Sequence, residues 1–375
     1  MTSRIVTAVC ALLLAASQAV ATVPPAATPG KAPAASSAAA TPAERLFQVT
    51  LRYNYHAVPK QVQRFDFWFP LAFDDAFQMR QNLFTMAPYD LEFQTDPVTG
   101  NVIYHMVGGP RGGVPLQVSF RMDMRRAAQR VDLTRPPAAP TTPAQDLAAR
   151  ERWLRPEKHC PLSKEAKTRA SKATKRGKPQ DRARGIFDYV VSNMTLLADA
   201  SKTPGAGQGD LDFALREMKG TAEDLASAFV GLCRALDIPA RTVMGMLIPE
   251  GVRNGQISGY HGWAEFYLDG YGWIPVDPAL AVRHPSRRDE YFGGLDANRV
   301  AISIGRDVTL IPVQSTGPLN YFINPHWEGD GLEMPSPWVE AEFTELESIP
   351  RMLSQPVDAD ASAPTTPAPG KPPTP

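Results

Sequence analysis

His261 and Asp277 are the residues of this chain best suited to acid–base chemistry. His261 opens a predicted strand over 261–268, and Asp277 follows a second predicted strand over 273–276. An imidazole acts as a general base when a carboxylate fixes its tautomer, and it then activates a neighbouring nucleophile for attack on a carbonyl. The sequence therefore predicts a His–carboxylate pair at one end of a two-stranded hairpin.

The position for a nucleophile is the start of the helix predicted over 223–236, where Thr221 is expected as the N-cap. Orphan N–H groups and the helix dipole lower the pKa of a cysteine at such a position and favour its thiolate. This chain has Ala222 there, and a methyl group cannot attack a carbonyl. The apolar stripe of the helix follows at helical spacing: Ala222, Leu225, Ala226, Phe229, Leu232, Cys233 and Leu236.

The loop of the hairpin decides whether His261 and Asp277 share a face, because strand side chains alternate. A two-residue loop would place them on opposite faces of the sheet. A three-residue loop or a bulge would place Asp277 opposite Trp263 and diagonal to His261. We expect the three-residue loop or the bulge.

Two regions of different periodicity must position these residues. From 46 to 124 apolar residues alternate with polar ones, which predicts an antiparallel, immunoglobulin-like β-sandwich over 45–135. From 181 to 340 the pattern is α+β, with helices over 182–194 and 223–236 and strands over 241–248, 261–268 and 273–276. We expect an α+β core in which the helix that begins beside position 222 packs on an antiparallel sheet.

The remaining segments have biased compositions. Residues 1–21 read as a signal peptide, which predicts an exported protein, periplasmic or secreted; a membrane anchor is the alternative, but the apolar run is too short to span a bilayer. Residues 22–44 form a Pro/Ala-rich linker and 341–375 a disordered tail. Residues 136–180 are expected as a basic linker or helical segment.

Charge and cysteine content exclude several classes of protein. The formal net charge is zero, with 39 basic and 39 acidic residues, so no overall field favours nucleic acid. The basic stretch 150–184 could contact an anionic polymer, but no aromatic residues are interleaved with it and a solvated helix is favoured. Cys160 and Cys233 are too few for a disulfide scaffold; they could pair, although Cys233 falls on the buried helix face. No metal motif is present and no cofactor is expected.

Four motifs together resemble the bacterial transglutaminase-like superfamily, whose fold is papain-like. They are GTAEDLAS at 220–227, LCRALDIPAR at 232–241, YHGWAEFY at 260–267 and GWIPVDP at 272–278. Segments 291–300 and 318–328 resemble the C-terminal extension of that group, and the likeness spans most of 46–340. It implies that His261 is the base, Asp277 its orienting acid and Ala222 the vacant cysteine position. Tyr260 and Trp263 are candidate substrate-binding residues, although Trp263 and Trp273 are more often core residues than a substrate platform.

Because position 222 is an alanine, the sequence allows two main hypotheses about function. Loss of the nucleophile in a comparable triad lowers the rate on the order of a million-fold. The first hypothesis is therefore an exported inactive homologue whose cleft binds peptide, protein or cell-wall material. The second is an active cysteine acyltransferase or peptidase whose nucleophile has been replaced. A third, weaker possibility is that the β-rich half is the working module. None of three neighbouring groups can replace the missing cysteine at position 222. Cys233 lies three turns further along the helix, and Cys160 is expected in a linker. The Thr221 hydroxyl lies about 100° away around the helix axis.

Three further side chains have structural interpretations. Glu265 is expected to pair with Arg241, or with another basic residue. His284 and His326 have no partner pattern and are expected at the surface.

Overall fold

The computed structural model describes residues 43–55, 58–110, 113–135 and 150–348. The predicted signal peptide lies outside these residues, as do nearly all of the Pro/Ala-rich linker and the segment beyond 348. Within the described ranges, no helix has the length and apolar character needed to cross a membrane.

The β-rich region contains two five-stranded sheets in which every strand pair is antiparallel. The first sheet has the order β11 (Asn254–Gln256), β18 (Trp338–Glu345), β1 (Glu44–Tyr55), β6 (Leu116–Ala127) and β3 (Gln78–Met86). The second has the order β17 (Leu332–Glu333), β16 (His326–Gly329), β2 (Phe65–Leu71), β5 (Val102–Gly108) and β4 (Leu91–Thr95).

The two sheets share an apolar core, because their strands alternate as the sequence predicts. In β1 every second residue is buried. Tyr53 lies 5.6 Å from Phe69 and Tyr55 lies 5.1 Å from Trp327, measured between ring centroids, and these contacts join the two sheets. Aromatic pairs at such distances add to the stability that burial provides. The buried apolar residues of β1 are Phe47, Val49, Leu51, Tyr53 and Tyr55.

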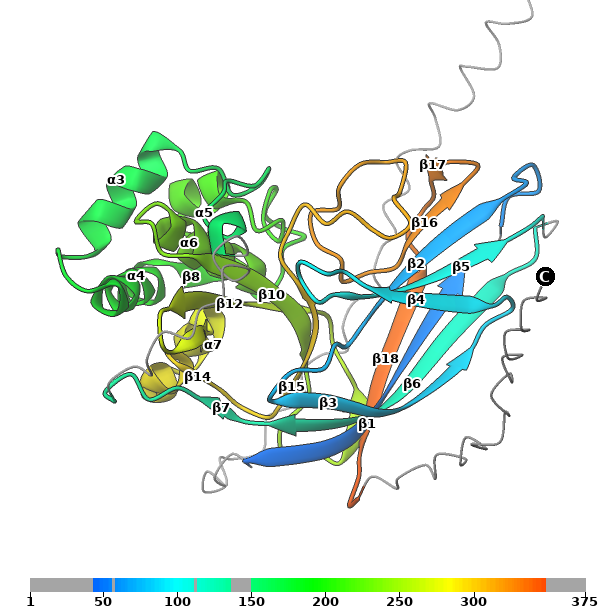
Figure 1. Ribbon diagram of the computed structural model, residues 1–375, viewed down its shortest axis with the longest axis horizontal. Helices are drawn as coiled ribbons and strands as arrows, with labels where there is room; N and C mark the ends of the chain where they lie inside the picture. The colour runs from blue at the N-terminus through cyan, green and yellow to red at the C-terminus, as the bar shows by residue number, and fades with distance from the viewer. Residues whose placement is uncertain (1–42, 56–57, 111–112, 136–149, 349–375) are drawn as a thin grey trace, which may run out of the picture. The chain divides into compact units, whose positions relative to one another are not determined.

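Strands from the far end of the chain complete both sheets. Figure 1 shows β16 and β18, in orange, among the blue and cyan strands. Strand β18 pairs with β1, and β16 pairs with β2. Residues 45–135 therefore do not build the two sheets alone, and the expectation of a disordered tail from residue 341 is wrong, because Ala341 and Phe343 are buried against the core.

A third sheet carries the candidate site. Its order is β13 (Gly272–Val276), β12 (His261–Leu268), β10 (Ala240–Leu247) and β15 (Arg299–Ile304). Helix α6 (Ala222–Arg234) packs on one face of it, where Phe229 meets Phe266 at 5.9 Å between ring centroids. All residues of α6 except Glu223 are buried. This is the helix-on-sheet arrangement expected from the apolar stripe.

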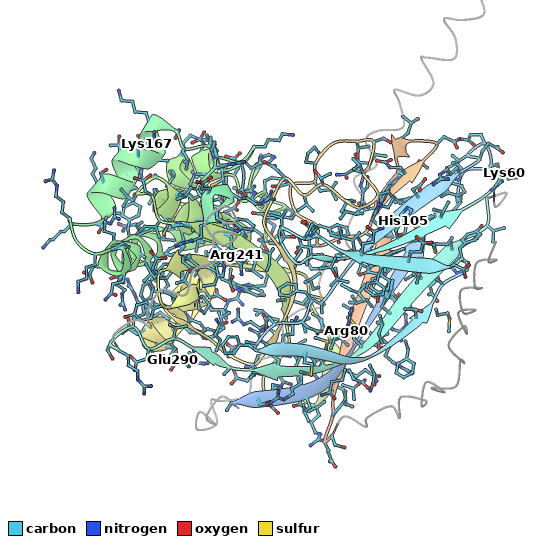
Figure 2. The ribbon with its side chains drawn as sticks, in the orientation of Figure 1. Lys60, Arg80, His105, Lys167, Arg241 and Glu290 are labelled. Carbon is cyan, nitrogen blue, oxygen red and sulfur yellow. The ribbon has the colours of Figure 1, made fainter. Side chains whose placement is uncertain are left out.

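The other α-helices pack around α6, and a 3₁₀ helix packs on the last of them in the chain. They are α3 (Lys164–Ala173), α4 (Pro179–Asn193), α5 (Leu211–Glu217), α7 (Pro278–Arg283) and the 3₁₀ helix η1 (Pro285–Tyr291). Two short sheets complete the described chain: β7 (Gln129–Arg130) with β14 (Gly294–Leu295), and β8 (Thr195–Leu196) with β9 (Lys219–Gly220). Lys167 of the basic stretch is exposed on α3, as Figure 2 shows, so this part of the stretch is a solvated helix.

The hairpin has the register that the site requires. Leu268 pairs with Gly272 and Ala264 pairs with Val276, so three residues lie in the loop. Continuing this register places Asp277 opposite Trp263, as predicted. The three-residue loop is therefore confirmed.

The start of α6 is fixed by a buried carboxylate. Thr221 is the N-cap, as expected, and its backbone N–H donates to Asp224 at 2.9 Å. Asp224 also accepts the backbone N–H groups of Gly207 at 2.7 Å and Gly209 at 2.8 Å. A charged acceptor satisfies these orphan donors and binds the preceding loop to the helix.

Candidate functional site

His261 and Asp277 form a direct pair inside the protein. The His261 Nε2 atom lies 2.8 Å from the Asp277 Oδ2 atom. The two residues are 4% and 0% exposed. A buried carboxylate at this distance fixes the orientation of the imidazole and leaves Nδ1 for a second partner.

Arg299 is a third member of this cluster, and the sequence reasoning missed it. Its Nη1 atom donates to Asp277 Oδ2 at 3.0 Å, and Nε approaches Asp296 Oδ1 at 3.4 Å. Arg299 lies on β15, within the 291–300 segment that resembles the family extension. The sequence spacing between Arg299 and His261 or Asp277 does not identify Arg299 as a site residue, because β15 joins the sheet through long-range pairing with β10.

The environment keeps Asp277 ionised. Burial by itself raises the pKa of Asp277, but the charge and hydrogen bond of His261 and the charge of Arg299 outweigh that effect. The pKa of this carboxyl is therefore held well below its usual range. Its other oxygen, Oδ1, accepts the backbone N–H of Leu280 at 2.9 Å and so caps α7. The carboxylate is thus both the partner of His261 and a structural cap.

Ala222 occupies the first position of α6 and is 8% exposed. The first turn of the helix lies against the beginning of β12. A Cβ atom built on Gly262 would be 3.1 Å from the Cα atom of Glu223. The neighbours of Ala222 and of His261 are therefore in contact, as the predicted site requires.

The two faces of β12 have different surroundings. Ala264 and Phe266 pack into the helical core with α6. Trp263 points to the opposite face and is 1% exposed, and its ring lies 6.3 Å from the His261 ring. The guanidinium of Arg299 lies 5.0 Å from the Trp263 ring centroid. Trp263 is thus a core residue that orients its neighbours, one of the two roles left open by the sequence.

Tyr260, the second candidate substrate-binding residue, is half-buried and packs against the core of the β-rich region. Burial raises the pKa of its hydroxyl, so this group is a neutral donor at physiological pH. No contact in the structure assigns it a substrate.

Neither described cysteine substitutes for the absent thiol. Cys160 and Cys233 are both fully buried and unpaired, and burial raises the pKa of each. A buried neutral thiol is a poor nucleophile. The expectation that Cys160 lies in a linker is wrong, because its side chain packs in the helical core close to Gly231 of α6.

The other predicted side chains divide into confirmed and corrected cases. Arg241 Nε donates to Glu265 at 2.7 Å, as expected. His284 is exposed at the end of α7. His326 is only 6% exposed and bonds Glu328 at 3.1 Å, so its surface placement is wrong. Strand β16 places it beside Trp68, a pairing that the sequence could not reveal. The described residues contain no cluster of ligands able to hold a metal ion.

Sequence comparisons agree with this geometry. The family model described as Transglutaminase-like superfamily matches residues 166–278. An uncharacterized protein from Haemophilus influenzae is 31% identical over 185 residues, which are 41% of this chain and 49% of that protein. The uncharacterized protein YebA from Bacillus subtilis is 30% identical over 118 residues, which are 28% of this chain and 16% of YebA. The chain thus spans about half of the first relative and less of the second.

One comparison with a solved structure shows the fold. A candidate cysteine protease from Cytophaga hutchinsonii superposes with a TM-score of 0.54 at 17% identity, covering 82% of this chain and 92% of the other. The periplasmic domain of TgpA from Pseudomonas aeruginosa is also similar, with a TM-score of 0.34 at 17% identity over 66% of this chain and 92% of that domain. The helix-on-sheet site and the matched segment lead to one conclusion: this chain contains a domain of the transglutaminase-like superfamily, over residues 166–278.

Proposed function

We propose that this protein is a catalytically inactive transglutaminase-like protein that acts by binding. One observation carries the proposal: α6 begins with Ala222, while the His261–Asp277 pair is complete and β12, which carries His261, contacts the first turn of α6. A site that keeps its base and orienting acid but has no nucleophile cannot form an acyl-enzyme. The expected cost on the order of a million-fold leaves no useful acyl transfer.

The partner we propose is a peptide, a protein or a cell-wall component. Support comes from the fold, which is shared with a protein described as a candidate cysteine protease, and a protease acts on polypeptides. This is an argument from fold, and fold alone does not determine function. We further propose that the chain is exported to the periplasm or secreted, on the strength of the 1–21 segment.

An immunoglobulin-like character of the β-rich region is part of the same proposal. Its two antiparallel sheets share one core, as sandwich domains do, but they include strands from residues 254–345. Under this proposal the β-rich region supports the transglutaminase-like domain from the face of β12 that carries Trp263.

An activated ester tests the inactivity directly. Wild-type protein, Ala222→Cys and the double variant Ala222→Cys/His261→Ala are mixed with p-nitrophenyl acetate, and p-nitrophenol release is followed. We expect no burst from the wild type, a burst equal to the protein concentration from Ala222→Cys, and a much slower burst from the double variant. A burst from the wild type that is lost in His261→Ala would show an active enzyme and overturn the proposal.

Binding is tested by co-sedimentation with purified peptidoglycan sacculi and by fluorescence anisotropy with labelled, unstructured peptides. We expect saturable binding to one of these ligands by the wild type and by Ala222→Cys alike, because the new thiol adds no bulk outside the cleft. Equal recovery with and without sacculi, together with no anisotropy change for any peptide, would contradict a binding role.

A further inference from the structure

A cavity lies on the face of β12 that is turned away from α6. It has a volume of about 200 Å³ and is bordered by residues of β6, β7, β10, β12 and β15. Its walls are buried and half-buried side chains, and its rim is exposed at Asp74, Asp75 and Gly100. Arg241, labelled in Figure 2, contributes to the wall from β10. This cavity is distinct from the position of Ala222.

Arg126 of β6 places an incompletely bonded charge in this cavity. The residue is 2% exposed, and its buried Nε and Nη1 atoms have no hydrogen-bond acceptor among the described residues. Burial lowers the pKa of Arg126 to about 10, which still leaves it charged at neutral pH. Burying a guanidinium without acceptors destabilises the folded state, because its N–H groups give up their hydrogen bonds to water and gain none in the protein.

Trp263 adds a third donor to the same cavity. It is 1% exposed, and its Nε1 atom likewise has no acceptor within the described part of the chain. The ring is held between His261 and Arg299, so the indole cannot turn away to find a partner. Buried indole N–H groups normally make a hydrogen bond. Arg126 and Trp263 thus both line this cavity, and three of their N–H donors have no acceptor among the described residues.

No carboxylate of the described residues accepts a hydrogen bond from Nε or Nη1 of Arg126, although Asp75 forms a long ion pair with it. Asp75, the nearest, stands 4.0 Å from Nη1, beyond hydrogen-bond distance. The existing pairs are Asp75 with the backbone N–H groups of Phe77 and Gln78, Glu265 with Arg241, and Asp296 with Arg299.

We propose that this cavity binds a small carboxylate, held by the guanidinium of Arg126 and the indole N–H of Trp263. The planar fork of an arginine matches the two oxygens of a carboxylate. The volume is below the range of roughly 300–1,000 Å³ typical of drug-sized ligands. The ligand is therefore a short acid or the terminal carboxyl residue of a peptide. This proposal does not depend on the inactivity of position 222.

Thermal unfolding and isothermal titration calorimetry test the site. The probes are acetate, N-acetyl-alanine and N-acetyl-alanine amide, each measured against sodium chloride at equal ionic strength. We expect saturable stabilisation by acetate and by N-acetyl-alanine, and none by the amide. Tighter binding of N-acetyl-alanine than of acetate identifies a peptide carboxyl terminus as the ligand, and the reverse order identifies a free short acid.

Two variants locate the binding. Trp263→Phe keeps an aromatic ring but removes the N–H together with part of the indole volume, and we expect affinity to fall about tenfold, the usual effect of one hydrogen bond to a charged group. Arg126→Met should abolish binding. Arg125→Met, on the same strand and at the surface, is the matched control and should bind as the wild type does.

Three results would overturn the proposal. One is the absence of any carboxylate-specific stabilisation of the wild type. Another is equal stabilisation by chloride and acetate, which would mark a nonspecific ion effect. The third is unchanged affinity in Trp263→Phe, a measurement that stands even if Arg126→Met fails to fold.

Discussion

Asp277 and Arg299 form an ion pair in which neither side chain has any exposed surface, with 3.0 Å between Oδ2 and Nη1. The pair joins the end of β13 to β15 beneath His261 and fixes the carboxylate that His261 bonds. Moving an ion pair from water into the protein interior costs free energy, but removing one partner of a buried pair destabilises the protein more. The candidate site is therefore also a structural centre of the domain.

Removal of Arg299 should destabilise the protein strongly. In Arg299→Met the Asp277 carboxylate would remain buried with one charged partner fewer, and breaking such a pair costs about 3–5 kcal/mol. Chemical denaturation at pH 7 measures the loss. Arg52→Met is the control, since its pair with Glu342 is more than a third exposed and exposed pairs contribute about 0–1 kcal/mol. Equal losses in the two variants would contradict the structural role of Arg299.

The depressed pKa of Asp277 predicts a loss of stability in acid. The folded pKa lies below the unfolded value of 3.8, so the contribution is fully present above pH ~5. It disappears as pH falls through the unfolded value toward the folded one. Urea midpoints measured from pH 7 to pH 3 should fall more steeply for the wild type than for Asp277→Asn. Parallel curves would show that Asp277 titrates normally.

Asp224 should matter more than an ordinary helix cap. Its carboxylate accepts three backbone N–H groups, from Gly207, Gly209 and Thr221. Because bonds to a charged group are worth about 1.5–3 kcal/mol each, Asp224→Ala should cost at least about 3 kcal/mol. Ser163→Ala, which removes a single cap bond at α3, should cost about 1 kcal/mol. A smaller loss at Asp224 than at Ser163, measured by denaturation, would contradict this ranking.

Gly262 should be intolerant of a side chain. A Cβ atom there would lie 3.1 Å from the Glu223 Cα and 3.2 Å from the Met244 Sδ. Gly262→Ala should therefore push the first turn of α6 away from β12, at about 1–3 kcal/mol. At Gly109 a Cβ would meet nothing within 4 Å, so Gly109→Ala is the control. Thermal unfolding compares the two, and a neutral Gly262→Ala would place α6 farther from β12 than the structure does.

The sequence predicted what depends on local pattern. Alternation in β1, the apolar stripe of α6 and the three-residue loop after Leu268 follow from periodicity and turn length. The position of Asp277 opposite Trp263 followed from the same arithmetic. These features need no knowledge of distant pairing.

The missed features all depend on contacts between distant segments. Arg299 reaches Asp277 only because β15 pairs with β10, and His326 is buried only because β16 pairs with β2. Cys160 is buried because its segment packs on α6. Arg126 and Trp263 line one cavity although they are 137 positions apart in the sequence. Single-residue patterns carry no signal for such meetings.

The most direct test of the central claim is the thiol pKa of Ala222→Cys, from the pH dependence of its alkylation rate. A helix start beside a preassembled His261–Asp277 pair predicts a pKa well below the ordinary value of about 8.5. The shift should be lost in Ala222→Cys/His261→Ala. It should also exceed that of Lys164→Cys, which opens α3 without a histidine. A normal pKa that is unchanged when His261 is removed would contradict a site complete except for its nucleophile.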